Sequence, residues 1–267
     1  NPFNSNIKIP DIIFVNLIIT DFEPLVDYYA FFKKIPVISI DNQHLIPEAN
    51  HDAISKNQRF SALVARLIVR LFIIKKNACF ITAIVPAKSS SSRFHLIEPL
   101  LRKEIIEGKP MKKEHILVYQ TSTSNKDLVS SLQRLADVRF LVYGLNENKK
   151  MGNVTLKKAS EKEFLEDLRT CRAVITNGGF TLISEAIHLK KPILSVPVKN
   201  HFEQFLNAMH VHMCGFGMYG EDINEHVVSQ FLDHLPEYEE YLKKHKKYSN
   251  KEAFRLIDKE IKRLTRS

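Results

Sequence analysis

The stretch from Arg172 to Gly217 constrains the fold more than any other part of the chain. It begins with a short apolar run at 173–176, typical of a buried strand, which Asn177-Gly178-Gly179 breaks. A helical periodicity follows, then a second apolar strand at 193–196 and a second helix at about 202–213. The order predicts a β–loop–α–β–loop–α unit with a Gly-Gly turn at the carboxyl end of a strand. Open α/β sheets bind their ligands at such a place.

The residues around this turn suit the parts of a nucleotide-sugar. Two glycines let backbone N–H groups approach a ligand, and the helix N-terminus that follows favours anions such as a diphosphate. Glu185 lies one helical turn beyond Thr181, where a carboxylate can accept hydrogen bonds from two vicinal hydroxyls, as on a ribose. Glu203 and Gln204 open the next helix and can bind further hydroxyls. The alternative is an ordinary Rossmann-like core, with a tight Gly-Gly turn and a solvated Glu185.

The order of these residues resembles the donor-binding domain of GT-B glycosyltransferases. It looks closest to the branch that holds UDP-glucuronosyltransferases, the lipid-linked N-acetylglucosaminyltransferase of peptidoglycan synthesis, and a poorly characterised microbial group. The resemblance implies that the Gly-Gly-x-Thr turn holds the diphosphate, Glu185 the ribose, and Glu203-Gln204 the donor sugar. Many relatives have His where this chain has Asn177, which can donate to a phosphate but carries no charge. The positions in register are Gly178, Gly179, Thr181, Glu185, Ala186, Lys191, Pro192, Val196, Pro197, Glu203, Gln204, Asn207, Ala208, Gly215 and Gly217.

We therefore expect an α/β chain of the GT-B type, with two Rossmann-like domains built on parallel sheets. Residues 1–98 form the acceptor-side domain, 99–114 the linker and 115–235 the donor-binding domain. The helices of 236–267 carry an apolar stripe and are expected to pack against the protein. The resemblance implies the first domain as the surface that they cover. Strand and helix patterns alternate without a break in the donor-binding domain, so its sheet should be parallel and doubly wound.

Thr121 and Ser122 follow the first strand of the donor-binding domain, in a loop rich in hydroxyl groups. Two interpretations of this loop stay open. It is either a second edge facing the phosphates, or the ordinary capped start of the next helix.

The acceptor-side domain offers two candidates for the catalytic base. Asp21 and His44 each follow a strand-like run, at 17–20 and 36–40, and both should face the cleft. A structural role is the alternative for each. Complete GT-B chains begin with a further strand and a Gly-rich loop that reaches the acceptor. Because no such element occurs here, we expect an incomplete N-terminal domain, whose missing part is a third place for the base.

A basic and apolar stretch at 54–77 suggests a membrane-facing helix. At helical spacing Arg59, Arg66 and Arg70 form a narrow stripe, while the residues around them are nearly all apolar. This pattern suits an interfacial helix on an anionic membrane, and equally a buried helix whose arginines meet acidic groups.

Composition narrows the setting and the partners. The net charge of +9 favours polyanions, such as anionic lipid or an anionic polymer acceptor. The sequence has no apolar run of about 18 residues, so we expect no transmembrane helix. Its first residues do not show the pattern of a signal peptide. Three separated cysteines indicate reduced thiols. We expect a cytoplasmic enzyme of the cell envelope, peripheral on the inner face of the membrane if the arginine stripe binds lipid.

Several other functions lack their motifs. His210 and His212 are two residues apart and point different ways on a helix, and there is no Asp-x-Asp pair, so we expect no metal and no other cofactor. Neither a hydrolase elbow nor a phosphate-binding P-loop occurs. Aliphatic rather than aromatic residues interleave the basic stretch, which argues against nucleic acid.

The sequence thus predicts a metal-independent, inverting glycosyltransferase that uses a UDP-sugar and a lipid-linked or polymeric acceptor. A nucleotide-sugar epimerase of the same fold stays open, as does a donor-binding subunit without activity of its own.

Overall fold

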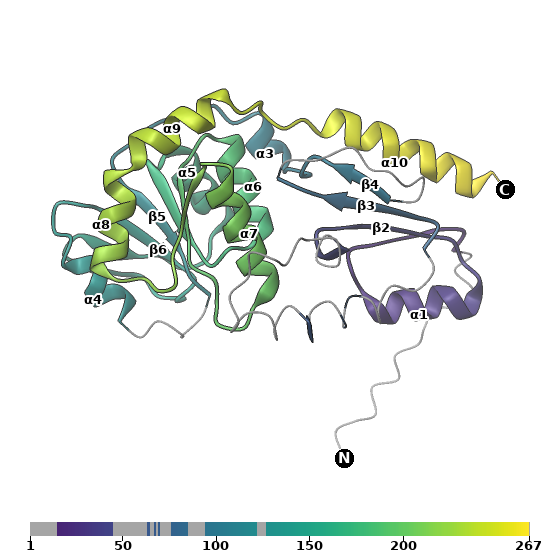
Figure 1. The fold of residues 1–267 in the computed structure, drawn as a ribbon, viewed down its shortest axis with the longest axis horizontal. Helices are drawn as coiled ribbons and strands as arrows, with labels where there is room; N and C mark the ends of the chain where they lie inside the picture. Colours follow the sequence, from purple (N-terminus) through teal and green to yellow (C-terminus); the bar gives the residue numbers. More distant parts are fainter. Residues whose placement is uncertain are drawn as a thin grey trace, which may run out of the picture.

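The computed structural model describes residues 15–44, 63, 64, 67, 69, 76–84, 94–121 and 127–266. Two β-sheets, each flanked by helices, dominate this part of the chain (Figure 1). The first sheet is entirely parallel, and its strands lie in the order β1 (Ile18–Thr20), β2 (Val37–Asp41), β3 (Ala78–Thr82) and β4 (Phe94–Ile97).

The second sheet has seven strands and is wound in two directions from its centre. Its order is β11 (Gly217–Tyr219), β10 (Ile193–Ser195), β9 (Ala173–Thr176), β5 (Ile116–Tyr119), β6 (Phe140–Tyr143), β8 (Val154–Leu156) and β7 (Lys149–Met151). From β5 the chain winds outward to β6 and β8, then returns to β9 and winds the other way. The order therefore reverses between β5 and β9, and a crevice opens at such a reversal, at the carboxyl ends of the strands.

One strand departs from the expected parallel arrangement. β7 pairs antiparallel with β8 in a hairpin whose turn residue Gly152 has φ +63°. β7 is short and carries two exposed lysines, as suits a sheet edge that must not pair further. Its polar sequence gives no strand pattern, which explains why the periodicity missed it.

Helices lie on both faces of the second sheet, and α1 (Pro24–Lys33) and α10 (Asn250–Thr265) lie on opposite sides of the first (Figure 1). The bounds of the other described helices are α3 (Lys103–Ile106), α4 (Leu128–Gln133), α5 (Glu161–Thr170), α6 (Phe180–His188), α7 (Phe202–Met213), α8 (Glu225–Asp233) and α9 (Leu235–Lys244). None of the described helices is both long and apolar enough to span a bilayer.

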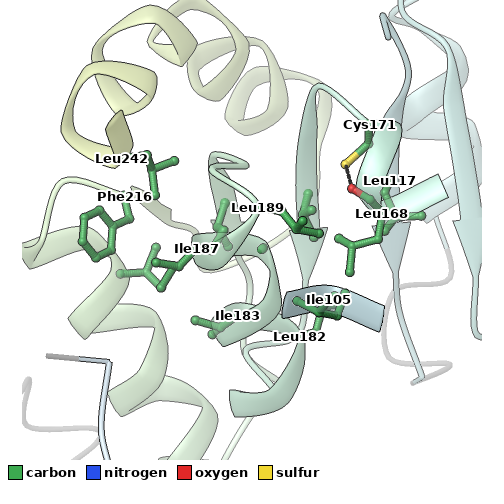
Figure 2. Close-up of a cluster of buried hydrophobic side chains, with 14 of the residues drawn as sticks. Ile105, Leu117, Leu168, Cys171, Leu182, Ile183, Ile187, Leu189, Phe216 and Leu242 are labelled. Atoms are coloured by element: carbon green, nitrogen blue, oxygen red, sulfur yellow. Dashed lines mark hydrogen bonds between the residues drawn. The ribbon is translucent and has the colours of Figure 1, made fainter. Parts of the chain in front are cut away.

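Alternate residues of the central strands enter two separate cores. Leu117 and Val174 face α5 and α6, in the cluster drawn in Figure 2. Their neighbours Val118 and Ile175 face α4 and α8 on the opposite side. A strand buried on both faces must be apolar at nearly every position, which is why β5 and β9 appear as unbroken apolar runs.

The C-terminal helix α10 lies along the first sheet (Figure 1). Ala253, Ile257 and Leu264 on one face of α10 pack against Phe80 and Ile97 of the sheet. The segment between the two sheets, predicted as a linker at 99–114, contains the short helix α3, and Ile105 of this helix is buried in the second core. The chain thus crosses between the two halves twice, once before β5 and once before α10.

Candidate active site

The carboxyl ends of the two sheets meet at a cavity of about 270 Å³. Asp21, Asp41 and Thr82 follow or end strands of the first sheet, while Thr181 and Glu203 come from α6 and α7 of the second half. A long hydrogen bond of 3.4 Å, from Gln43 Nε2 to Glu203 Oε2, joins the two walls. The lining is completed by Ile40, Asn42, Gln43, Leu100, Phe180 and Ser184.

The Gly-Gly turn leads to the N-terminus of α6. Gly178 has φ +94°, and a Cβ there would lie 2.7 Å from the backbone oxygen of Gln204, so this position requires glycine. Asn207 is buried and its Nδ2 donates to Gly178 O at 3.1 Å, which fixes the turn against α7. Gly179 caps α6 without a side-chain hydrogen bond and, like Thr181, is exposed. The first-turn N–H groups of α6 therefore suit an anion.

Asn177 fastens the loops at the strand-order reversal. Its Nδ2 donates to Gln120 Oε1 at 2.6 Å and to Val196 O at 3.3 Å, and its Oδ1 accepts the N–H of Thr121 at 3.1 Å. Both amide hydrogens are thus engaged, and the side chain is buried. In this structure Asn177 ties β5, β9 and β10 together, and its contact with a phosphate stays a prediction. Ser122, which with Thr121 was expected to form either a second phosphate-facing edge or a capped helix start, lies outside the described residues.

Glu185 forms a buried ion pair that the sequence did not predict. Its side chain is 1% exposed, and its two oxygens accept from Arg102 Nε at 2.7 Å and from a terminal guanidinium nitrogen at 2.8 Å. Arg102 also bonds Glu161 at 3.0 Å and is 35% exposed. The hydrogen bond to Glu185 is the main reason that the pKa of Arg102 is raised. A ribose can reach Glu185 here only by taking the place of at least one of these bonds.

Glu203 and Gln204 have different surroundings although they are adjacent. Glu203 lines the cavity, and burial, with the nearby Asp21 and Asp41, raises the pKa of its carboxyl. Gln204 instead accepts the N–H of Val198 at 2.9 Å through Oε1 and so braces the loop before α7. That loop borders a second pocket of about 480 Å³, lined by residues 197–202, Phe205 and 219–222.

The two predicted bases lie in different environments. Asp21 is exposed to the cavity, and burial followed by the charge of Asp41 raises its pKa. His44 is buried and is absent from the cavity lining. The geometry therefore gives Asp21, but not His44, the cleft-facing position expected of both.

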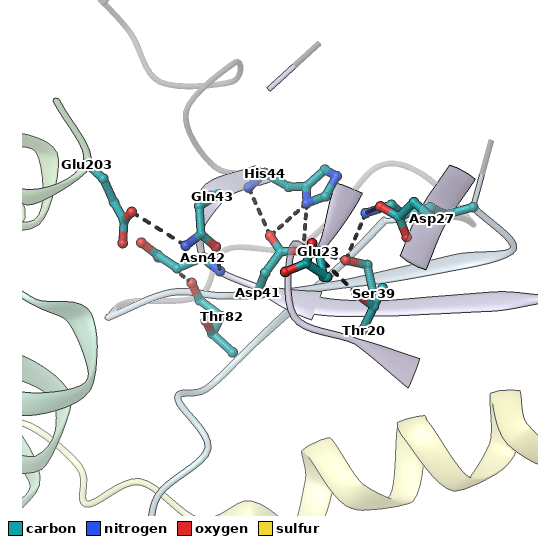
Figure 3. A network of polar contacts seen from close by, with 11 residues as sticks. Thr20, Glu23, Asp27, Ser39, Asp41, Asn42, Gln43, His44, Thr82 and Glu203 are labelled. Carbon is teal, nitrogen blue, oxygen red and sulfur yellow. Dashed lines mark hydrogen bonds and ion pairs between the residues drawn. The ribbon is translucent and has the colours of Figure 1, made fainter. Parts of the chain in front are cut away.

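His44 belongs to a buried polar network centred on Asp41 (Figure 3). His44 Nδ1 lies 2.7 Å from both Asp41 oxygens, and Ser39 Oγ donates to Asp41 Oδ2 at 2.5 Å. Lys76 Nζ in turn lies 3.1 Å from both Ser39 Oγ and Asp27 Oδ2. Burial tends to raise the pKa of Asp41, but the bonds and charge of His44 and the bond from Ser39 lower it overall. Asp41 lines the cavity and was missed, although the polar run from Asp41 to His44 marked the strand end.

Asp41, His44 and Cys79 also bring potential metal-ligating atoms within 4.8 Å of one another. Burial and the charge of Asp41 raise the pKa of the Cys79 thiol to about 12, so the group is a neutral thiol. The Asp41 carboxylate is already bonded to His44 and Ser39, with the Lys76 ammonium close behind. These surroundings fit a hydrogen-bonded network better than a cation site, and the metal-free prediction remains to be tested.

The arginine stripe of Arg59, Arg66 and Arg70 lies outside the described residues. Of the same stretch, Leu63, Val64 and Leu67 are exposed, whereas Val69 is buried against Phe202, Phe205 and Leu206 of α7. The described positions thus include both exposed and buried apolar residues, and both interpretations of this stretch stay open.

A sequence profile described as glycosyl transferase family 1 matches residues 7–236, well over half of the chain. The chain belongs to glycosyl transferase family 1. Among curated proteins, an uncharacterized glycosyltransferase of Methanopyrus kandleri is 44% identical over 54 residues. That alignment covers 20% of this chain and 16% of the other protein.

Solved structures of glycosyltransferases share the fold of this family 1 chain. The glycosyltransferase of kitacinnamycin has a TM-score of 0.56 at 16% identity, covering 85% of this chain and 70% of its own. CalG4, the calicheamicin glycosyltransferase, has a TM-score of 0.56 at 17% identity, and the match covers 85% of this chain and 67% of the CalG4 chain. Phytolacca americana UGT2, complexed with UDP-2-fluoro-glucose and pterostilbene, has a TM-score of 0.58 at 10% identity. That match covers 84% of this chain and 68% of the UGT2 chain. These likenesses confirm the predicted α/β GT-B fold.

Proposed function

We propose that this family 1 chain transfers a sugar from a UDP-sugar to an acceptor hydroxyl within the cavity between the two sheets. The observation that carries the proposal is the meeting of Asp21 and Asp41 with Thr181 and Glu203 around one sugar-sized space. Parallel strands present their carboxyl ends on one edge, and here two such edges face each other. A cavity of about 270 Å³ has room for one sugar ring, while the diphosphate extends toward the Gly-Gly turn.

In the proposed reaction the acceptor oxygen attacks the anomeric carbon of the donor. The bond from that carbon to the diphosphate oxygen breaks, and UDP leaves with inversion at the carbon. Asp21 takes the acceptor proton, since its carboxyl is exposed to the cavity and its raised pKa makes it a better base. The Asp41 network fixes the neighbouring wall, with His44 as a positioning residue. First-turn N–H groups of α6 stabilise the charge on the diphosphate, without a metal ion.

The donor is assigned by the residues and by analogy. The N-terminus of α6 suits the diphosphate, and Glu185 suits a ribose once Arg102 gives up one of its two bonds. UDP is supported by the UDP-2-fluoro-glucose complex of the plant protein of the same fold. Glu203 has the position to bind hydroxyls of the transferred sugar.

Isothermal titration calorimetry of the purified chain with UDP tests whether UDP is part of the donor. Release of UDP from a UDP-sugar in the presence of candidate acceptors tests whether the sugar is transferred. We expect UDP binding that is weakened by Glu185→Gln. An epimerase of the same fold would convert the donor sugar without any acceptor, and a binding subunit would hold UDP without turnover. Absence of UDP binding by the folded wild-type chain would contradict the proposal itself.

Helix α1 supports an acceptor presented at an anionic membrane. Five of its ten residues are large apolar side chains that are exposed, followed by exposed Lys33 and Lys34. Aromatic rings beside lysines suit the interface between headgroups and acyl chains, and the net charge of +9 complements anionic lipid. The exposed apolar residues are Leu25, Tyr28, Tyr29, Phe31 and Phe32.

Co-sedimentation with phosphatidylserine vesicles tests this part of the proposal. We expect binding at low salt that Leu25→Ser with Phe32→Ser abolishes. Phe254→Ser is the matched control, because Phe254 is also exposed but lies on α10. Equal sedimentation of wild type and the α1 variant would exclude α1 as the membrane contact.

A further inference from the structure

We propose that the sugar accepted by this cavity carries no acidic group, so that a neutral hexose or an amino sugar is selected over a uronic acid. This inference rests on the proposed function, because it concerns the sugar held between the Gly-Gly turn and Asp21. It also runs against the net positive charge of the whole chain, which favours anions elsewhere on the surface.

The charge of the cavity wall is negative on both sides. Asp21 and Asp41 contribute carboxyl groups from the first sheet, and Glu203 contributes one from α7. The described lining residues otherwise offer amides and hydroxyls, from Asn42, Gln43, Thr82, Thr181 and Ser184, together with apolar groups. None of the described lining residues is Lys, Arg or His. A neutral polyol finds acceptors and donors among these described residues, whereas a sugar carboxylate finds no basic side chain among them.

Three of the described basic side chains around this wall already have partners of their own. Lys76 bonds Asp27 and Ser39, on the far side of Asp41. His44 is bonded to Asp41 and buried. Arg102 is bound to Glu185 and Glu161. The charge of Asp41 is thus partly balanced, and the charges of Asp21 and Glu203 are the ones that a sugar would meet.

The acidic groups already affect one another. Burial is the main reason that the pKa values of Asp21 and Glu203 are raised, and carboxylates across the cavity add to the effect. His201, beside the second pocket, acts in the opposite direction on Glu203. A further carboxylate in the same space would add repulsion without relieving any. The diphosphate escapes this penalty because it lies at the α6 N-terminus, where backbone N–H groups face it.

UDP-glucose and UDP-glucuronate measure the effect directly, since they differ only in a hydroxymethyl group and a carboxylate. If the sugar carboxylate lies about 7 Å from one carboxylate of the wall, with the screening typical of charges near a protein surface, their repulsion weakens binding by on the order of tenfold or more. Titration calorimetry of the full chain with UDP, both sugars and UDP-glucosamine should therefore show UDP-glucuronate binding at least about tenfold weaker than UDP-glucose. UDP-glucosamine should bind at least as well as UDP-glucose.

Variants that remove one carboxylate from the wall show whether UDP-glucuronate is disfavoured by charge repulsion or by the shape of the cavity. Glu203→Gln should narrow the ratio between UDP-glucose and UDP-glucuronate several-fold, and Asp21→Asn provides a second variant should that one not fold. Glu237→Gln removes an exposed acid on α9 and should leave the ratio unchanged. If wild type binds UDP yet takes both sugars equally, or prefers the uronate, this inference is wrong and the proposed function survives. Failure to bind UDP at all overturns both.

Discussion

Replacing Arg102 with glutamine leaves a buried carboxylate without its cation. Glu185 sits in the middle of α6, is 1% exposed, and receives two hydrogen bonds of 2.7 and 2.8 Å from the Arg102 guanidinium. The two residues are 83 positions apart, so this pair joins the segment after the first sheet to the core of the second. Stability should therefore depend on it.

The size of the effect follows from the burial of each partner. Removing one partner of a fully buried pair costs about 3–5 kcal/mol, because the other charge is left uncompensated. Arg102 is 35% exposed, so water screens its charge and reaches part of the vacated space. We expect Arg102→Gln to lower the free energy of unfolding by about 2–3 kcal/mol. Glu185→Gln with Arg102→Gln should recover part of that loss.

Urea unfolding followed by circular dichroism measures the change. Arg255→Gln is the matched control, since Arg255 makes an equally bidentate pair with Glu252 but on the exposed face of α10. That variant should show no measurable loss. The same proteins, titrated with UDP, test the ribose role: Glu185→Gln should weaken UDP binding by about 1–3 kcal/mol, while Arg102→Gln should not weaken it. A loss below about 0.5 kcal/mol for Arg102→Gln, or unchanged UDP affinity for Glu185→Gln, would refute this reasoning.

Three further predictions follow from the same geometry. Burial and the charge of Asp41 raise the pKa of Asp21, so the apparent pKa on the acidic side of the pH profile of kcat/KM should lie above the ordinary carboxyl value of 3.8. Asp41→Asn should move this apparent pKa to lower pH. An unchanged value would exclude Asp21 as the base. UDP binding should survive EDTA, and binding recovered only with magnesium or manganese would contradict the metal-free site. Gly178→Ala should destabilise the fold by about 1–3 kcal/mol, judged by thermal unfolding, because its φ is +94° and a Cβ meets Gln204 O at 2.7 Å. Gly179→Ala, whose Cβ meets nothing within 4 Å, should be tolerated.

Local patterns predicted much of the fold because each strand and helix that lines the two cores carries an apolar pattern of its own. β5 and β9 are apolar at nearly every position since helices cover both faces of their sheet, and the alternation with helices then implies a parallel arrangement. β7 was missed because an exposed edge strand of three polar or half-buried residues has no apolar pattern.

The candidate site was predictable only where its residues act locally. The Gly178-Gly179 turn and the start of α6 follow from residue type and spacing. The partners of Asn177 and Glu185 lie 57 and 83 positions away, and no local pattern reports such pairings. Asp41 and His44 are only three residues apart, but which of them faces the cavity depends on how the chain turns after β2.

Hydrogen–deuterium exchange with and without UDP tests most directly whether the donor binds between the two sheets. Saturating UDP should slow exchange in peptides that cover the Gly-Gly turn with α6 and the start of α7, at about 177–187 and 201–208. Exchange in the second half of α10, at about 257–265, should stay unchanged, because no α10 residue is among the described residues that line the cavity. Protection confined to other peptides, or none at all despite measured binding, would contradict a donor site at the carboxyl ends of β5 and β9.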